Sequence, residues 1–387
     1  MRELSDVQLV LEQAKICPSS LCDDVQVLSL SDPVFPQRIK ILEVSEELVH
    51  ELEKDKKLTL RGDRGDAAVL CSQTKSWELR EAECSNSMVL FPDTLVSEGT
   101  AATTGQKQMK FHQANGFYNT YLELRPHVLK LESLRGALNS CPYMGPEHEN
   151  DTEILSAQKY TFVDLLETVQ CSQAELAAFL SKELAVSIDG YWRMLHFSYV
   201  TRVISELISV LDENSWSWKS FPWSEACTTL LELEPQFALD KVIAKYAFPI
   251  DNGPQWCLNE HEICTLYAQI ILKPLEKFKL SEFMQIWQES VPEGMQTSVS
   301  HLQKTCVIFR YCEPVTIEFF DVSELPSDPQ ERLECLFRKM QRWAESDLVP
   351  FLQDVVASKS AMDSLLLKHC RSSTVDGRKM LTYRKPL

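Results

Sequence analysis

The residues with the clearest chemistry are the lysines and arginines near the C-terminal end of the chain. Between Leu367 and Leu387 there are six of them and one acid, a local charge of +5 in a chain whose net charge is −17. An acidic protein does not bind polyanions through its overall field, so contact with nucleic acid requires a local basic surface. An exposed basic tail without a partner is the alternative. We predict phosphate contacts for Lys368, Arg371, Arg378, Lys379, Arg384 and Lys385.

Sequence motifs for catalysis are missing. The chain contains neither the GxxxxGK[ST] phosphate-binding loop nor the G-x-S-x-G nucleophile elbow. The stretch that begins at His261-Glu262 starts like the zinc-protease motif HExxH, but Thr265 stands where the second histidine must be. We therefore predict no catalytic residue, no cofactor and no enzymatic activity.

The best candidate metal ligands are Cys257, His261 and Cys264. Structural zinc sites need four ligands, usually built from paired cysteines, and the fourth ligand is missing here. The chain has 13 cysteines and begins with a polar, charged segment rather than a secretory signal, which is typical of reduced thiols in the cytosol or nucleus. Buried thiols are thus the favoured interpretation, and no metal site is predicted.

The segment that carries the basic residues predicts a winged helix. Apolar spacing indicates a helix over 330–343, a second helix capped by Ser346, and a third over 362–369. Asp376-Gly377 is typical of a tight turn, and 379–384 alternates as a strand does. In a winged helix the third helix and the hairpin can meet DNA. Many such folds bind only proteins, so the fold alone does not establish a DNA contact.

The rest of the chain predicts an α+β protein with a β-barrel-like N-terminal region and tandem winged-helix domains. Short alternating runs in the first hundred residues indicate a small barrel or sandwich, followed by a polar linker at 96–108. Helical periodicity begins at Tyr160, with hairpins expected at 185–195 and 306–320, and we count three winged-helix units with a fourth possible. The predicted domains are 1–125 (β-rich assembly domain), 126–158 (helix and linker), 159–215 (first winged helix), 216–325 (second winged-helix region) and 326–387 (third winged helix with the basic wing).

Short segments along nearly the whole chain, in a consistent order, form a recognisable set. They are Leu60-Arg61-Gly62-Asp63, Ala68-Val69-Leu70-Cys71-Ser72, Ser76-Trp77-Glu78-Leu79-Arg80 with Ser85-Asn86, Tyr121-Leu122-Glu123-Leu124-Arg125-Pro126, Gly190-Tyr191-Trp192-Arg193, Trp287-Gln288-Glu289-Ser290-Val291-Pro292-Glu293-Gly294-Met295, and the tail from Ser372-Ser373 to Arg384-Lys385-Pro386. Together they resemble the sister-chromatid-cohesion Dcc family, a non-ATPase subunit of the alternative (cohesion-type) replication factor C clamp loader. Little resemblance is found between Ser215 and Lys273.

The resemblance implies a nuclear scaffold or adaptor without catalytic activity. In that family the N-terminal region joins a composite β-barrel with a small companion subunit and the C-terminal end of the large ATPase subunit. The complex is implied to load or unload the PCNA sliding clamp, to support DNA replication and sister chromatid cohesion, and to link the loader to DNA polymerase epsilon.

Two further expectations follow from the resemblance. The winged helices are implied to touch single- or double-stranded DNA, and the region of Tyr191, Trp192 and Arg193 to face the polymerase. No membrane contact is expected. A winged-helix scaffold that binds proteins and has no DNA role is the alternative.

Overall fold

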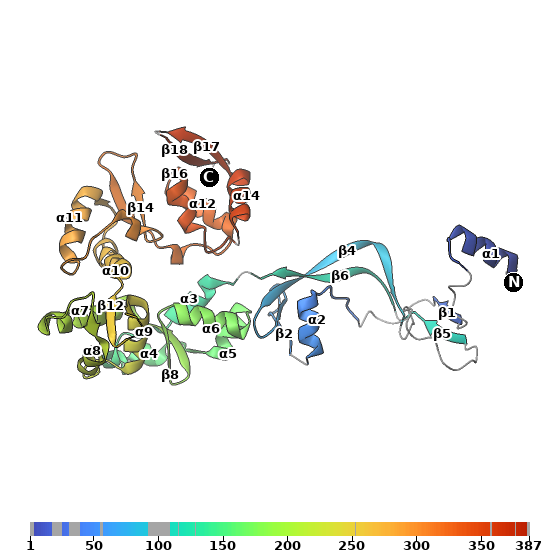
Figure 1. Ribbon diagram of the computed structural model, residues 1–387, viewed down its shortest axis with the longest axis horizontal. Coiled ribbons are helices and arrows are strands. Elements are labelled where there is room, and N and C mark those ends of the chain that lie inside the picture. Colours follow the sequence, from blue (N-terminus) through green and yellow to red (C-terminus); the bar gives the residue numbers. More distant parts are fainter. Residues whose placement is uncertain are drawn as a thin grey trace. The chain divides into compact units, whose positions relative to one another are not determined.

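The computed structural model describes residues 4–17, 25–30, 39–54, 57–91, 109–114, 116–127, 129–251, 253–356, 358–375 and 377–384. It separates into an N-terminal unit, Met1–Lys56 with Trp77–Arg125, and a larger unit, Lys57–Ser76 with Pro126–Leu387 (Figure 1). Helices and several small sheets occur together, which confirms the predicted α+β class. In the parts of the chain just given, no helix has the length and apolar character needed to cross a membrane.

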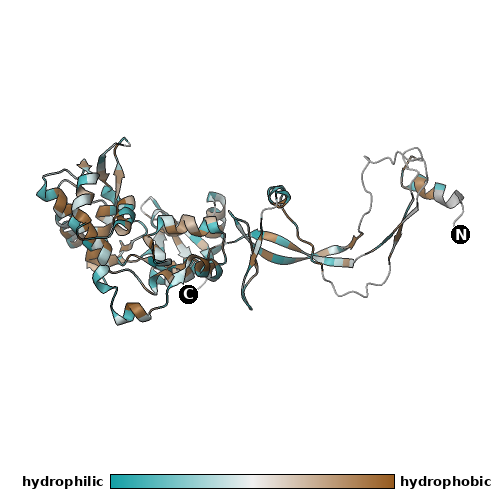
Figure 2. Cartoon of the chain, turned by 90° about the horizontal axis from the view of Figure 1, so that it is seen from below, coloured by the Kyte–Doolittle hydropathy of each residue, from teal (hydrophilic) through white to brown (hydrophobic). Residues whose placement is uncertain are grey.

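In the N-terminal unit, the described residues form two short helices and four strands. The helices are α1 (Leu4–Gln13) and α2 (Glu46–Glu53), and α2 begins after Ser45, whose side chain accepts a hydrogen bond from the backbone N–H of Leu48. Strand β1 (Val25–Ser29) pairs in parallel with β5 (Met109–Gln113). The other two strands are the long β4 (Ser76–Leu90) and β6 (Gly116–Pro126). Hydrophilic and hydrophobic stretches alternate along the long strands (Figure 2).

The predicted barrel is not closed by the strands that the structure describes. Closure needs an unbroken ring of paired strands. The β1–β5 pair instead forms a sheet of its own, and β6 lies at the edge of the sheet that contains β4. Local alternation predicted the strands but carries no information about closure, which depends on partners distant in sequence. The linker predicted at 96–108 lies outside the described residues.

In the larger unit, a hairpin packs against the start of a helix that is distant in sequence. The hairpin consists of β2 (Thr59–Arg61) and β3 (Val69–Cys71). Just after it, the Ser76 hydroxyl accepts a hydrogen bond from the backbone N–H of Ser172 at 2.8 Å and donates to the Glu175 carboxylate. Ser172 and Glu175 form the capping box of α6 (Gln173–Lys182), so Ser76 links the start of this helix to the hairpin.

This link predicts a measurable coupling. Ser76→Ala should lower the free energy of unfolding by about 1–2 kcal/mol, because the backbone N–H of Ser172 and the Glu175 carboxylate each lose a buried partner. Urea denaturation followed by tryptophan fluorescence measures the change. Ser85→Ala, on an exposed part of the same strand, is the control and should have little effect. Equal stability of both variants would contradict the coupling.

One arrangement recurs four times among the described residues of the larger unit. A short strand leads directly into helical segments, a hairpin follows, and the short strand pairs with the second strand of the hairpin, which gives the sheet orders β7-β9-β8, β10-β12-β11, β13-β15-β14 and β16-β18-β17. We call these the first to fourth modules. The predicted range 216–325 contains two of them.

The first module consists of β7 (Tyr160–Thr161), α5 (Phe162–Val169), α6, β8 (Ala185–Ile188) and β9 (Tyr191–Met194). The second consists of β10 (Phe221–Pro222), α8 (Trp223–Leu230), α9 (Gln236–Tyr246), β11 (Ala247–Pro249) and β12 (Gln255–Leu258). The third consists of β13 (Phe278–Lys279), α11 (Leu280–Ser290), η3 (Val299–Leu302), β14 (Cys306–Phe309) and β15 (Thr316–Phe319). The fourth consists of β16 (Arg342–Ala344), α13 (Glu345–Leu348), η5 (Val349–Phe351), α14 (Lys359–His369), β17 (Cys370–Val375) and β18 (Arg378–Tyr383).

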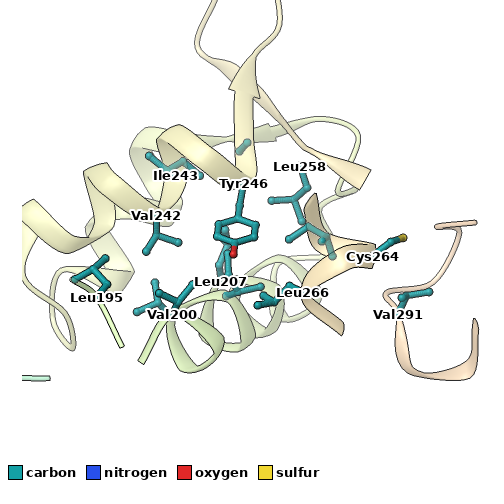
Figure 3. Close-up of a cluster of buried hydrophobic side chains, with 14 of the residues drawn as sticks. Leu195, Val200, Leu207, Val242, Ile243, Tyr246, Leu258, Cys264, Leu266 and Val291 are labelled. Carbon is teal, nitrogen blue, oxygen red and sulfur yellow. The ribbon is translucent and has the colours of Figure 1, made fainter. Parts of the chain in front are cut away.

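Helices before and between the modules complete the unit. They are α3 (Leu131–Asn139), η2 (Pro146–His148), α4 (Thr152–Ser156), α7 (Phe197–Glu213), α10 (Glu260–Leu272), η4 (Val322–Glu324) and α12 (Pro329–Lys339). One buried apolar cluster runs through α7, α9 and α10 into the third module. Figure 3 shows Tyr246 of α9 at the centre of this cluster, with Leu207 of α7 nearby. The second and third modules therefore share a core.

The structure confirms some of the predicted elements and corrects others. Both predicted hairpins are present. The first turns through Asp189 and Gly190, whose φ angles of 51° and 84° are the positive values that a two-residue loop requires. The helix predicted over 330–343 ends at Lys339, because Trp343 belongs to β16 and its backbone pairs with Leu381. The second helix begins after Ala344 rather than Ser346 and is only one turn long before η5.

Candidate nucleic-acid interface

Helix α14 and the β17–β18 hairpin carry the predicted phosphate-binding residues. The helix begins after Ser358, whose hydroxyl accepts a hydrogen bond from the backbone N–H of Ala361, and it buries Met362 and Leu366. It leads straight into β17, whose pairing with β18 extends from Cys370 opposite Tyr383 to Val375 opposite Arg378. The fourth module is drawn in red in Figure 1. Its buried residues pack into an apolar cluster with α12 and with Val307 of the third module, whereas much of the rest of α14 and of the hairpin is exposed.

One set of cations lies where α14 meets β17. Lys368 is in the last turn of the helix, and Arg371 follows on β17. Arg384 is fixed beside them, since its backbone N–H and its Nε donate to the carbonyls of His369 and Cys370, both at 2.9 Å. In the sheet, Thr382 lies between Arg371 and Arg342 of β16, so these two arginines share a face. We call Arg342, Lys368, Arg371 and Arg384 the junction group.

A second set lies at the turn of the hairpin. Lys359, Arg378 and Lys379 line a hollow of about 670 Å³, which Glu345 and Asp363 also line. The Nζ of Lys379 is 2.9 Å from a carboxylate oxygen of Glu345. Exposed ion pairs contribute little to stability, so Lys379 can exchange this partner for a phosphate at small cost. We call Lys359, Arg378 and Lys379 the hairpin group.

The two groups are at opposite ends of the hairpin. Arg378 pairs with Val375, four positions along β17 from Arg371, a separation of roughly 13 Å at the usual strand rise. Within the described residues, no ion pair engages Arg342, Lys359, Lys368, Arg371 or Arg378. Lys385 lies outside those residues. A continuous row of phosphates is the kind of ligand that can engage both ends.

Two cations of the site were missed by the sequence analysis. Arg342 was assigned to a helix, although the alternation of Arg342, Trp343 and Ala344 is that of a short strand. Lys359 precedes the third helix as predicted over 362–369, although Ser358 before it is a good helix cap. Their contribution depends on where the fold places them, because neither lies within the basic C-terminal segment.

The three residues predicted to face a polymerase have very different environments. Tyr191 is exposed, whereas Trp192 packs against Phe162, with ring centroids 6.4 Å apart. Arg193 is only 2% exposed and donates to both carboxylate oxygens of Glu149, at 2.6 and 2.9 Å, and to the carbonyl of Cys141. Of the three, Tyr191 therefore presents the most accessible side chain, and the guanidinium of Arg193 is occupied within the protein.

The candidate metal ligands do not converge. Cys257 is on β12, while His261 and Cys264 are on α10. Cys264 lies in the apolar cluster of Figure 3, and burial raises the pKa of its thiol to about 11, which disfavours the thiolate that metals bind. Across the described ranges, no three side chains of His, Cys, Asp or Glu are grouped as a metal site requires.

Comparison with known proteins finds similarity along the whole chain. A sequence model of the family described as "Sister chromatid cohesion protein Dcc1" matches residues 39–352. The chain is 35% identical over 390 residues to the Sister chromatid cohesion protein DCC1 of Danio rerio, covering 100% of both chains. It is 33% identical over 391 residues to the Homo sapiens protein of the same name, covering 100% of this chain and 99% of the human one. For the Saccharomyces cerevisiae protein of that name the identity is 21% over 382 residues, covering 92% and 98%.

Proposed function

From the premise that this chain belongs to the sister chromatid cohesion protein Dcc1 family and so has a role in cohesion, we propose that it is a non-catalytic nuclear scaffold of a clamp loader. Its C-terminal modules hold DNA, and its N-terminal unit pairs with other subunits. The loader is an alternative replication factor C that loads or unloads the PCNA sliding clamp and is linked through this chain to DNA polymerase epsilon during replication.

The observation that carries the DNA-binding part is the placement of the two cation groups. In the fourth module, α14 precedes the β17–β18 hairpin, and β18 also pairs with the short strand β16. A winged helix requires this order of elements. The junction and hairpin groups lie on that helix, that hairpin and the adjoining strand. Residues 1–366 carry a net charge of −22, so an exposed cationic surface on this module is distinct from the rest of the chain.

Exposed apolar side chains support the assembly part of the proposal. On the β1–β5 sheet, Leu28 is 49% and Phe111 is 74% exposed. Unpaired strand edges and apolar side chains of this kind are costly in water and are readily covered by another chain. We propose that strands of the large ATPase subunit and of a small companion subunit complete a barrel here. Tyr191 on the first module is the exposed aromatic that we assign to the polymerase contact.

The salt dependence of DNA binding tests the proposal. We expect the full-length chain to bind a labelled duplex with an affinity that falls with salt, at a slope of log K against log salt of roughly −4 to −5 if five phosphates are contacted. Fluorescence anisotropy at several salt concentrations measures this slope. Duplexes of different sequence should give the same result, because phosphate contacts do not read bases. Absence of binding at low salt would favour the alternative, a winged-helix scaffold that binds only proteins.

A further inference from the structure

A second hollow adjoins the one lined by the hairpin group. It has a volume of about 270 Å³ and lies between the third and fourth modules. Gln303, Ser346 and Pro350 line both hollows, so the two are contiguous. A ligand whose charged part rests on Lys359, Arg378 and Lys379 therefore has a neighbouring cavity within reach.

The walls of this second hollow are mostly apolar. Ile308 and Met340 line it, together with Trp343 and Phe351, which are nearly fully buried and meet edge to face with centroids 5.8 Å apart. Pockets for drug-sized ligands have volumes of roughly 300–1,000 Å³, so this cavity suits one flat ring system rather than a larger molecule. A largely apolar cavity beside a cationic surface matches a nucleotide, in which a sugar joins a base to a phosphate.

Hydrogen-bonding groups are also among the residues that line the cavity. The Nε of Arg310 is 3.5 Å from a carboxylate oxygen of Asp347, and the terminal nitrogens of Arg310 form no hydrogen bond to any residue that the structure describes. The Ser346 hydroxyl donates to the other carboxylate oxygen of Asp347 at 3.2 Å. A guanidinium donor beside a carboxylate acceptor complements the edge of a base, which presents acceptors next to N–H donors.

We propose that this cavity, which we call the base pocket, receives one unpaired nucleobase of the strand whose phosphates the hairpin group holds. The inference rests on the proposed DNA binding and adds a preference to it. In a duplex the pairing edge of each base is occupied, so only an unpaired or extruded base can enter such a pocket. The C-terminal modules thus favour single strands, or duplex ends that fray, over fully paired DNA.

The test compares a single-stranded oligonucleotide with an abasic strand of the same length, by anisotropy with the full-length chain. The abasic strand measures phosphate binding, and the ratio of the two affinities measures the base pocket. We expect wild type to bind the strand with bases at least about fivefold more tightly, because burial of one base is worth that much or more. Ser346→Trp, which places an indole among the residues that line the pocket, should bring the ratio close to one.

Further variants separate the pocket from general damage. Arg310→Met should also lower the ratio of the two affinities. The loss of one positive charge weakens binding to both strands alike, so it does not affect this ratio. Ser209→Trp, at an exposed position on α7, is the matched control and should keep the wild-type ratio. A wild-type ratio of one, or an unchanged ratio in Ser346→Trp, would refute the base pocket while leaving phosphate binding intact. Failure of wild type to bind either strand would instead refute the proposed DNA binding, and the base pocket with it.

Discussion

Replacing Arg193 with alanine should lower the free energy of unfolding by about 3–5 kcal/mol, the usual cost of breaking a buried ion pair by removing one partner. The guanidinium forms a two-pronged pair with Glu149 and also donates to the carbonyls of Cys141 and Pro142. The guanidinium carbon of Arg193 is 5.5 Å from the ring centroid of Tyr143, so the substitution also removes packing against this ring. Chemical denaturation monitored by circular dichroism measures the loss.

Arg338→Ala is the matched control. This arginine is also paired with a carboxylate, that of Glu334 at 3.9 Å, but its side chain is largely exposed, so the change should be within about 1 kcal/mol. The comparison also separates two roles for Arg193. A variant that is as stable as wild type, yet fails to bind polymerase, would contradict the structural role and restore the sequence-based hypothesis of a direct partner contact.

Local patterns in the sequence predicted much of the architecture of the larger unit. The capping box at Ser172 and Glu175 specifies the start of α6, and the Asp189-Gly190 pair specifies the first hairpin, because each signal lies within a few residues. The inward face of α14 was predicted in the same way from the spacing of Met362 and Leu366. The basic segment was found because charge can be counted without knowing the fold.

Features that depend on distant residues were not predictable in this way. Nothing near Arg342 indicates that β16 pairs with β18, so its place beside Arg371 became visible only in the structure. Arg332 has the sequence context of an exposed helix, yet its side chain is 0% exposed and binds Asp354 and the carbonyl of Phe351. The described strands of the N-terminal unit do not close into the predicted barrel, and periodicity carries no information about closure.

Reversing the cations of the fourth module should produce the largest change in DNA binding. One variant changes Arg342, Lys368 and Arg371 of the junction group to glutamate, and another changes all three residues of the hairpin group. Each should weaken binding at least about 100-fold, because hydrogen bonds to charged groups contribute roughly 1.5–3 kcal/mol apiece. Each should also make the salt dependence less steep, by about one unit of slope for every phosphate contact that the variant loses. Anisotropy titrations measure both quantities.

The control for these variants carries the same change of charge outside the fourth module, with Lys182, Lys219 and Lys279 changed to glutamate. If net charge alone governs binding, the control should lose as much affinity as the other two variants. If the placement of the cations governs it, the control should lose far less, and only the hairpin variant should also lose the preference for strands with bases, because the base pocket adjoins that group alone. Wild-type titration curves for both the junction and the hairpin variants would remove the fourth module from the DNA-binding surface.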